Sequence, residues 1–146
     1  MSATQEAIDL TMIAARAASD IKATSIVAID VAQRLAITDV FLIVSGSTER
    51  QVRSIVDAVE EAMHKAGTRR LRREDLEGEA HWVLLDFGII MVHVQQDEDR
   101  EYYALEKLWG DCPKIELDPD IVATPAAEES SLSAYFAPVY EEEESN

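Results

Sequence analysis

The stretch Trp82–Gln95, with the sequence WVLLDFGIIMVHVQ, decides the fold of this chain because it predicts a β-hairpin. Gly88 can adopt the positive φ that a tight two-residue loop requires, so the turn is predicted at Phe87 and Gly88. This loop fixes three facing pairs across the hairpin: Asp86 with Ile89, Leu84 with Met91, and Trp82 with His93.

The two faces of the predicted hairpin differ in chemistry because side chains alternate along a strand. One face is purely aliphatic and is the expected core side: Val83, Leu85, Ile90 and Val92. The other face mixes aromatic, carboxylate, imidazole and thioether groups: Trp82, Leu84, Asp86, Ile89, Met91 and His93. Such a mixed face either lies under a helix or meets a partner, and the choice between them decides the function.

The residues before the hairpin predict alternating helices and strands. Ser2 and Gln5 have the spacing of a capping box, and the helix that follows runs to about Ser19. Ser25–Val31 is a predicted strand. Val40–Val44 is apolar at every position, which suits a central strand buried on both faces.

A second helix is predicted between Gly46 and Gly67. Thr48 and Gln51 again have capping-box spacing, and Gly67 is the expected stop. Its apolar residues follow the helical repeat without a break: Val52, Ile55, Val56, Val59 and Met63. Residues 68–78 are expected to form an edge strand and a loop.

A short helix is predicted after the hairpin, from Asp97 until Gly110 and Pro113 end it. This helix and the hairpin bring four aromatic residues close together in sequence: Trp82, Tyr102, Tyr103 and Trp109. The cluster is either a binding hot spot or a secondary core where the helix packs on the hairpin. The pattern alone favours neither.

The composition limits the classes of function. The chain has 146 residues and a net charge of −16. This charge argues against binding nucleic-acid phosphates or an anionic membrane, and it favours a basic partner. There is no apolar signal core at the N-terminus and no stretch long enough to span a bilayer, so a cytoplasmic protein is expected.

The chain is expected to divide at residue 114 into an α/β domain (1–114) and a tail (115–146). The tail contains no Lys or Arg and nine acidic residues: Glu116, Asp118, Asp120, Glu128, Glu129 and Glu141–Glu144. A segment of this composition buries too little apolar surface to order itself, so it is predicted to be largely disordered.

Catalysis is the less favoured alternative. Gly46 and Ser47 resemble the phosphate-binding turn of a nucleotidyltransferase or another nucleotide-binding enzyme, with Asp86 as a magnesium ligand. The second carboxylate of such a metal clamp is missing beside Asp86. His93 has no second histidine at a metal-binding spacing, and Cys112 has no adjacent histidine to activate its thiol. The sequence therefore predicts no enzyme, no cofactor and no metal site.

Two segments resemble the ribosomal silencing factor family, also called the Iojap-related proteins. The front segment is IDVAQRLAITDVFLIVSGSTERQVRSIVDAVEEAM, and the back segment is WVLLDFGIIMVHVQ followed by REYYALEKLWGD. The similarity covers roughly residues 5–113. Its most specific elements are Thr38-Asp39, Ser45-Gly46, Arg50-Gln51, Trp82–Asp86, Val92-His93, Glu101–Tyr103, Leu105-Glu106 and Leu108-Trp109.

The resemblance implies a mixed β-sheet flanked by helices, distantly similar to nucleotidyltransferases but without their activity. It implies a translational repressor that binds the large ribosomal subunit through ribosomal protein L fourteen, blocks joining of the small subunit and acts when nutrients are short. The free protein is expected to form a homodimer. The expected partner-binding residues are Trp82, Leu84, Asp86, Met91, His93, Tyr102, Leu105, Leu108 and Trp109.

Overall fold

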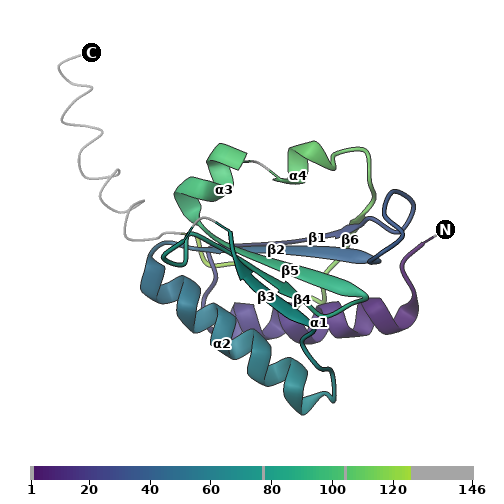
Figure 1. The fold of residues 1–146 in the computed structure, drawn as a ribbon, viewed down its shortest axis with the longest axis horizontal. Coiled ribbons are helices and arrows are strands. Elements are labelled where there is room, and N and C mark those ends of the chain that lie inside the picture. Colours follow the sequence, from purple (N-terminus) through teal and green to yellow (C-terminus); the bar gives the residue numbers. More distant parts are fainter. Residues whose placement is uncertain (1, 77, 104, 126–146) are drawn as a thin grey trace.

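A six-stranded mixed β-sheet separates two layers of helices in this computed structural model, which describes residues 2–76, 78–103 and 105–125 (Figure 1). The strands lie in the order β3-β4-β5-β2-β1-β6. The elements are α1 (Gln5–Asp20), β1 (Ser25–Asp30), β2 (Val40–Gly46), α2 (Glu49–Lys65), β3 (Arg72–Asp75), β4 (Trp82–Asp86), β5 (Ile90–Gln96), α3 (Asp97–Tyr103), α4 (Leu105–Leu108) and β6 (Lys114–Ile115). The predicted α/β fold with a mixed sheet is confirmed.

Strand β2 occupies the centre of the sheet, as its sequence predicted. All seven of its residues are buried. It pairs in parallel with β5 and antiparallel with β1. Helices lie on both faces of the sheet at this position (Figure 1). A strand in this position needs apolar side chains on both sides, which explains the uninterrupted run from Val40 to Val44.

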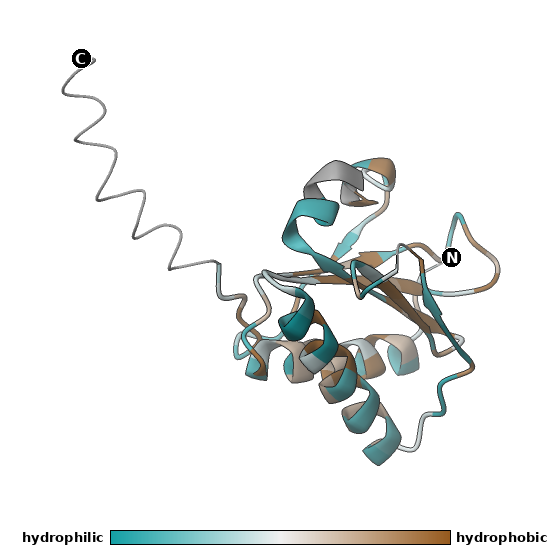
Figure 2. Ribbon diagram, turned by 60° about the vertical axis from the view of Figure 1, so that its left-hand side comes forward, coloured by the Kyte–Doolittle hydropathy of each residue, from teal (hydrophilic) through white to brown (hydrophobic). Residues whose placement is uncertain are grey.

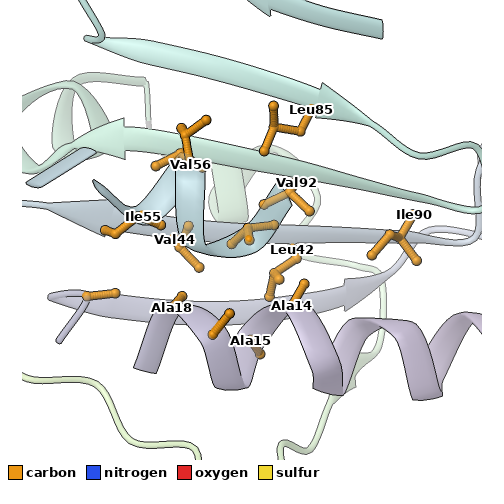
Figure 3. Close-up of a cluster of buried hydrophobic side chains, with 14 of the residues drawn as sticks. Ala14, Ala15, Ala18, Leu42, Val44, Ile55, Val56, Leu85, Ile90 and Val92 are labelled. Carbon is orange, nitrogen blue, oxygen red and sulfur yellow. The ribbon is translucent and has the colours of Figure 1, made fainter. Parts of the chain in front are cut away.

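The larger core lies between the sheet and helices α1 and α2 (Figure 3). The hairpin contributes its aliphatic face, as predicted: Val83, Leu85, Ile90 and Val92. Helix α1 contributes mostly alanines, whose small side chains allow close approach to the sheet. The predicted stripe of α2 is buried at every position, and the hydrophilic residues of α2 lie on its other side (Figure 2).

The starts of the two long helices differ in how well the sequence predicted them. Thr48 caps α2, since its side chain accepts a hydrogen bond from the Gln51 backbone nitrogen (3.0 Å). In α1 the cap is Thr4 and not the predicted Ser2. The reason is long-range, because the carboxylate of Asp30 accepts from the Ala3 nitrogen and that of Asp39 from the Thr4 nitrogen, both at 2.9 Å.

The hairpin forms, but its register differs from the predicted one by two residues. Asp86 pairs with Met91, and Leu84 pairs with His93. The two loop residues are Gly88 and Ile89, because the Phe87 nitrogen donates to the Ile90 carbonyl oxygen (3.0 Å). Gly88 has φ +91°, as a glycine at the first position of a type II′ turn requires. A shift of two keeps every strand residue on its predicted face.

Ile89 is an exception to the predicted hairpin faces. It lies in the turn and packs against the larger core, so it does not belong to the mixed face. The predicted last helix also differs from the structure, which has two short helices, α3 and α4, in its place.

Residues 115–125 pack on the domain, although they belong to the segment that was predicted to be largely disordered. Lys114–Ile115 forms strand β6 on β1, and Ile121 is buried in the larger core. Arg16 of α1 donates to Asp118 (2.8 Å) and Asp120 (2.7 Å). Composition alone did not reveal the ion pairs with Arg16 or the burial of Ile121. The rest of the predicted tail, residues 126–146, lies outside the described residues.

Candidate interaction face

The mixed face of the hairpin lines a second, smaller core between the sheet and helices α3 and α4. Its buried members are Ile29, Val31, Phe41, Ile43, Met91, Leu105 and Cys112. Five hydrophobic side chains are only half-buried at its border, and three of them come from the hairpin and the last helix: Trp82, Leu84 and Trp109. We call these three residues the aromatic rim. The centre of the mixed face is therefore core beneath the helices, whereas its border reaches solvent.

The predicted partner-binding residues divide between these two environments. Met91, His93 and Leu105 are buried, with 7–8% of each residue exposed. Leu108 is 65% exposed and lies next to Trp109 in the chain. Tyr102 lies outside the residues whose side chains the structure describes.

His93 is held in a fixed orientation by aromatic neighbours. The ring of Phe41 meets it edge-on, with 4.8 Å between ring centroids. The indole Nε1–H of Trp82 donates to His93 Nδ1 (3.1 Å). Because Nδ1 accepts this bond, the proton of the neutral ring is on Nε2. Burial lowers the pKa of His93 to about 4, so the ring is neutral at physiological pH.

Trp109 is held at the border by a cation that the sequence did not reveal. The guanidinium carbon of Arg34 lies 4.6 Å from the centroid of the Trp109 ring, and Arg34 also pairs with Asp111 (2.7 Å). The edge of the Phe41 ring supports the indole from the sheet. Arg34 is 75 positions before Trp109 and has no local motif, so only the fold brings the two together.

Asp86 lies at the hairpin turn, and most of its bonding is local. Its Oδ1 accepts a hydrogen bond from the Gly88 nitrogen (2.9 Å), as in an Asx turn. Its other oxygen lies 3.8 Å from the guanidinium of Arg72 on β3. The carboxylate therefore stabilises the turn, and 15% of the side chain is exposed.

The residues of the enzyme alternative lie at opposite ends of the sheet. Gly46 pairs with Gln96 at one end of β5, whereas Asp86 pairs with Met91 near the other end. Five residues of strand separate these positions, or about 16 Å. The N-terminus of α2 is also occupied by the chain itself, because Gln51 Oε1 accepts from the Ser47 nitrogen (2.7 Å). The fold does not assemble a nucleotidyl-transfer site from these residues.

A histidine–carboxylate pair that sequence reasoning missed links the hairpin to α3. His81 Nδ1 lies 2.8 Å from Asp99 Oδ2. The hydrogen bond to Asp99 raises the pKa of His81 because it favours the charged imidazolium. The pair ties the first turn of α3 to the start of β4.

The described ranges hold no candidate for a metal centre or a membrane span. No group of three or more His, Cys, Asp or Glu residues there is arranged to hold a metal ion. No described helix is long and apolar enough to cross a membrane.

The fold and the face define a small α/β domain with two half-buried tryptophans, Trp82 and Trp109, at the border of its smaller core. The sequence model described as "Ribosomal silencing factor during starvation" matches residues 4–139. The chain belongs to the ribosomal silencing factor family, as its motifs predicted.

Individual relatives agree with this assignment. The chain is 40% identical over 110 residues to a ribosomal silencing factor of Halalkalibacterium halodurans, covering 75% of this chain and 93% of the relative. A crystal structure of a Bacillus halodurans protein superposes with a TM-score of 0.64 at 38% identity, covering 78% of this chain and all of that one. A mouse protein named "Mitochondrial assembly of ribosomal large subunit protein 1" is 33% identical over 89 residues, covering 60% of this chain and 39% of that protein.

Proposed function

We propose that this protein binds the large ribosomal subunit through ribosomal protein L fourteen and thereby blocks association with the small subunit. The observation that carries the proposal is the aromatic rim, found on a member of the ribosomal silencing factor family. In this proposal the protein represses translation in the cytoplasm under starvation by steric exclusion and without catalysis. Its free form is proposed to be a homodimer, which sedimentation analysis of the purified protein tests.

Two further observations support a ribosomal partner. The name of the mouse relative refers to the large ribosomal subunit. The chain carries 29 acidic and 13 basic residues, so its surface attracts a basic protein and is repelled by exposed RNA phosphates. Charge complementarity of this kind speeds the encounter and disfavours wrong partners.

The structure suggests separate roles for five of the nine predicted binding residues. The rim residues Trp82 and Trp109 have the size and the partial exposure of interface anchors. Leu108 extends the apolar surface beside them. Buried Met91 and His93 act as a rigid support beneath the rim and do not reach a partner directly. A rigid support matters because a preorganised surface loses less entropy on binding.

The test is co-sedimentation of purified large subunits with single variants of the face. Trp109→Ala and Leu108→Ser should each weaken binding, and the tryptophan change should cost about 2 kcal/mol or more, roughly thirtyfold in Kd. Leu108 is the cleaner probe because it is 65% exposed and contributes little to folding. Inhibition of subunit joining should fall in parallel with binding.

The matched control is Val122→Ser. Val122 is also exposed (57%) but lies beside Ser19 of α1, on the other side of the sheet. This variant should bind like the parent. If the Leu108 and Trp109 variants remain folded and bind as tightly as the control, the aromatic rim is not the binding surface.

A further inference from the structure

The positive charge of this acidic chain is concentrated at one place. Five of its 13 Lys and Arg residues fall within nine positions, between the end of α2 and strand β3. All five are exposed, and we call them the basic edge: Lys65, Arg69, Arg70, Arg72 and Arg73. In a chain with a net charge of −16, this is where an acidic ligand is attracted.

The basic edge also offers apolar contacts. Leu71 lies within it and is 67% exposed. A surface cavity of about 510 Å³ opens beside Arg69 and Arg70, with Phe87 and the exposed Gly67 in its wall. Strand β3 ends the sheet on this side. A ligand that combines acidic and aromatic groups therefore matches this surface.

Acidic neighbours neutralise only part of the basic edge. Arg70 pairs with Glu60 (2.8 Å), and Lys65 approaches Glu61 at 3.3 Å. Arg73 approaches Glu60 only at 4.0 Å, and Arg69 makes no ion pair with any residue that the structure describes. Arg69 and Arg73 are thus the charges most available to a further acid.

The chain itself supplies a ligand of the matching chemistry. Residues 126–146 contain six glutamates and no Lys or Arg, and four of the glutamates are consecutive, Glu141–Glu144. Aromatic and apolar residues come shortly before this run: Tyr135, Phe136, Val139 and Tyr140. The apolar residues of this segment match the cavity, and the glutamates that follow them match the arginines at its border.

The acidic segment, residues 126–146, has to span about the length of helix α2 to reach the basic edge. The Thr124 nitrogen donates to the Ala23 carbonyl oxygen (2.8 Å), and Gln51 at the start of α2 donates to that of Lys22 (2.8 Å). The described chain therefore ends beside the N-terminus of α2, while the basic edge begins at its C-terminus. The 17 residues of α2 span about 25 Å.

The length of the acidic segment suits this distance. Glu141 is 16 residues beyond Pro125. A flexible chain of that length has a root-mean-square extent of about 20–24 Å. The effective concentration of a tethered ligand is highest when its extent matches the span. Tethering therefore favours this segment over an RNA phosphate chain, which the overall negative charge repels.

We propose that Glu141–Glu144 docks on the basic edge of the same molecule, with the preceding aromatic residues against Leu71 and the neighbouring cavity. The contact covers the outer side of β3. It goes beyond the proposed ribosome binding and holds independently of it, because the basic edge does not include the aromatic rim.

Paramagnetic relaxation in the full-length chain tests the contact. A nitroxide is attached at Ser145→Cys in a Cys112→Ala background, and amide signals are recorded at low salt. Signals of residues 67–73 should lose at least half of their intensity relative to the reduced label, and those of α1 should not. Because exposed charges are screened beyond about 3 Å in 1 M salt, the loss should disappear at that concentration.

Charge variants separate the contact from chance proximity. Changing Glu141–Glu144 to glutamine, or combining Arg69→Ser with Arg73→Ser, should abolish the broadening. The matched controls Glu128→Gln with Glu129→Gln, and Arg50→Ser at an exposed arginine at the start of α2, should retain it. Uniform or absent broadening in the parent would overturn the proposal.

Two other occupants of the basic edge would also overturn the proposal. A mixture of spin-labelled and ¹⁵N-labelled molecules reports contacts between copies. Broadening that persists in this mixture at the same strength would mean that the segment docks on a second molecule. Shifts of residues 67–73 with an RNA oligonucleotide, in a parent that shows no tail broadening, would assign the basic edge to RNA.

Discussion

At the scale of single residues, the buried polar side chains of β5 are costly to the fold. Gln95 is fully buried, and neither its Oε1 nor its Nε2 finds a hydrogen-bond partner among the described residues. His93 Nε2, two positions away on the same face, is likewise unpaired there. An unsatisfied buried polar group costs about 1–3 kcal/mol. We infer that these unpaired polar groups of β5 lower the free energy of unfolding.

The substitution Gln95→Met should therefore raise the free energy of unfolding by about 1 kcal/mol or more, since it keeps the volume and removes two unpaired polar atoms. Urea denaturation of the parent and the variant measures the change. The control is Gln96→Met at the next, half-buried position, where the amide donates to the Ala80 carbonyl oxygen. No gain for Gln95→Met would mean that ordered water satisfies the amide.

Residues could be predicted from the sequence where their role is local. The buried stripe of α2 and its Thr48 cap follow from spacing alone. The support of Trp109 by Arg34 and the pairing of His81 with Asp99 join positions far apart in the chain, and no short motif encodes them. Apart from Ile89, the sequence therefore predicted which hairpin residues make the mixed face, but not which of them reach solvent.

At the scale of elements, the attachment of α3 is expected to depend on pH. The hydrogen bond to Asp99 raises the pKa of His81 in the folded protein above its unfolded value. The contribution of the His81–Asp99 pair to stability is complete below about pH 6.5, the ordinary pKa of histidine. It is lost as the pH rises through the higher pKa of His81 in the folded protein. Hydrogen exchange of α3 amides, corrected for its intrinsic pH dependence, should show weaker protection at about pH 8 than at about pH 6.

Two variants check that His81 causes this change. Asp99→Asn and His81→Gln should each remove the pH dependence of α3 protection. His93 cannot produce it, because its pKa is lowered to about 4 and it stays neutral throughout this range. A pH dependence that survives both substitutions would contradict the role given to His81.

The hairpin shows why elements are easier to predict than their pairing. The strands and the glycine turn were evident from the sequence, but the register depends on which residue precedes the loop. Phe87 extends β4 by pairing with Ile90, and its ring is buried in the larger core. Burial of the Phe87 ring depends on the tertiary structure, and it outweighed the local sequence preference for a turn at Phe87 and Gly88.

At the scale of the whole molecule, the segment after β6 is expected to contribute to stability. Ile121 is 8% exposed and joins the larger core, whereas its neighbour Val122 is 57% exposed. Ile121→Ala should lower the free energy of unfolding by about 2 kcal/mol, the lower end for a buried isoleucine. Val122→Ala should change it by less than about 0.5 kcal/mol.

Thermal or urea unfolding of the two full-length variants decides the point. Equal stabilities would mean that residues 115–125 do not pack in solution as they do in the structure. The composition of this segment pointed to disorder because it has three acidic residues, two prolines and no Lys or Arg. Its anchoring depends on Arg16 of α1, about a hundred positions earlier, and such a contact is visible only in the assembled fold.

The outer strands of the sheet also determine whether copies of the protein associate at high concentration. β6 is two residues long, and β3 has the sequence RRED, with four charged residues. Short and charged borders resist pairing with a strand of another chain, which is the first step toward fibres. Copies of this protein are therefore expected to remain dispersed at high concentration and not to join strand to strand.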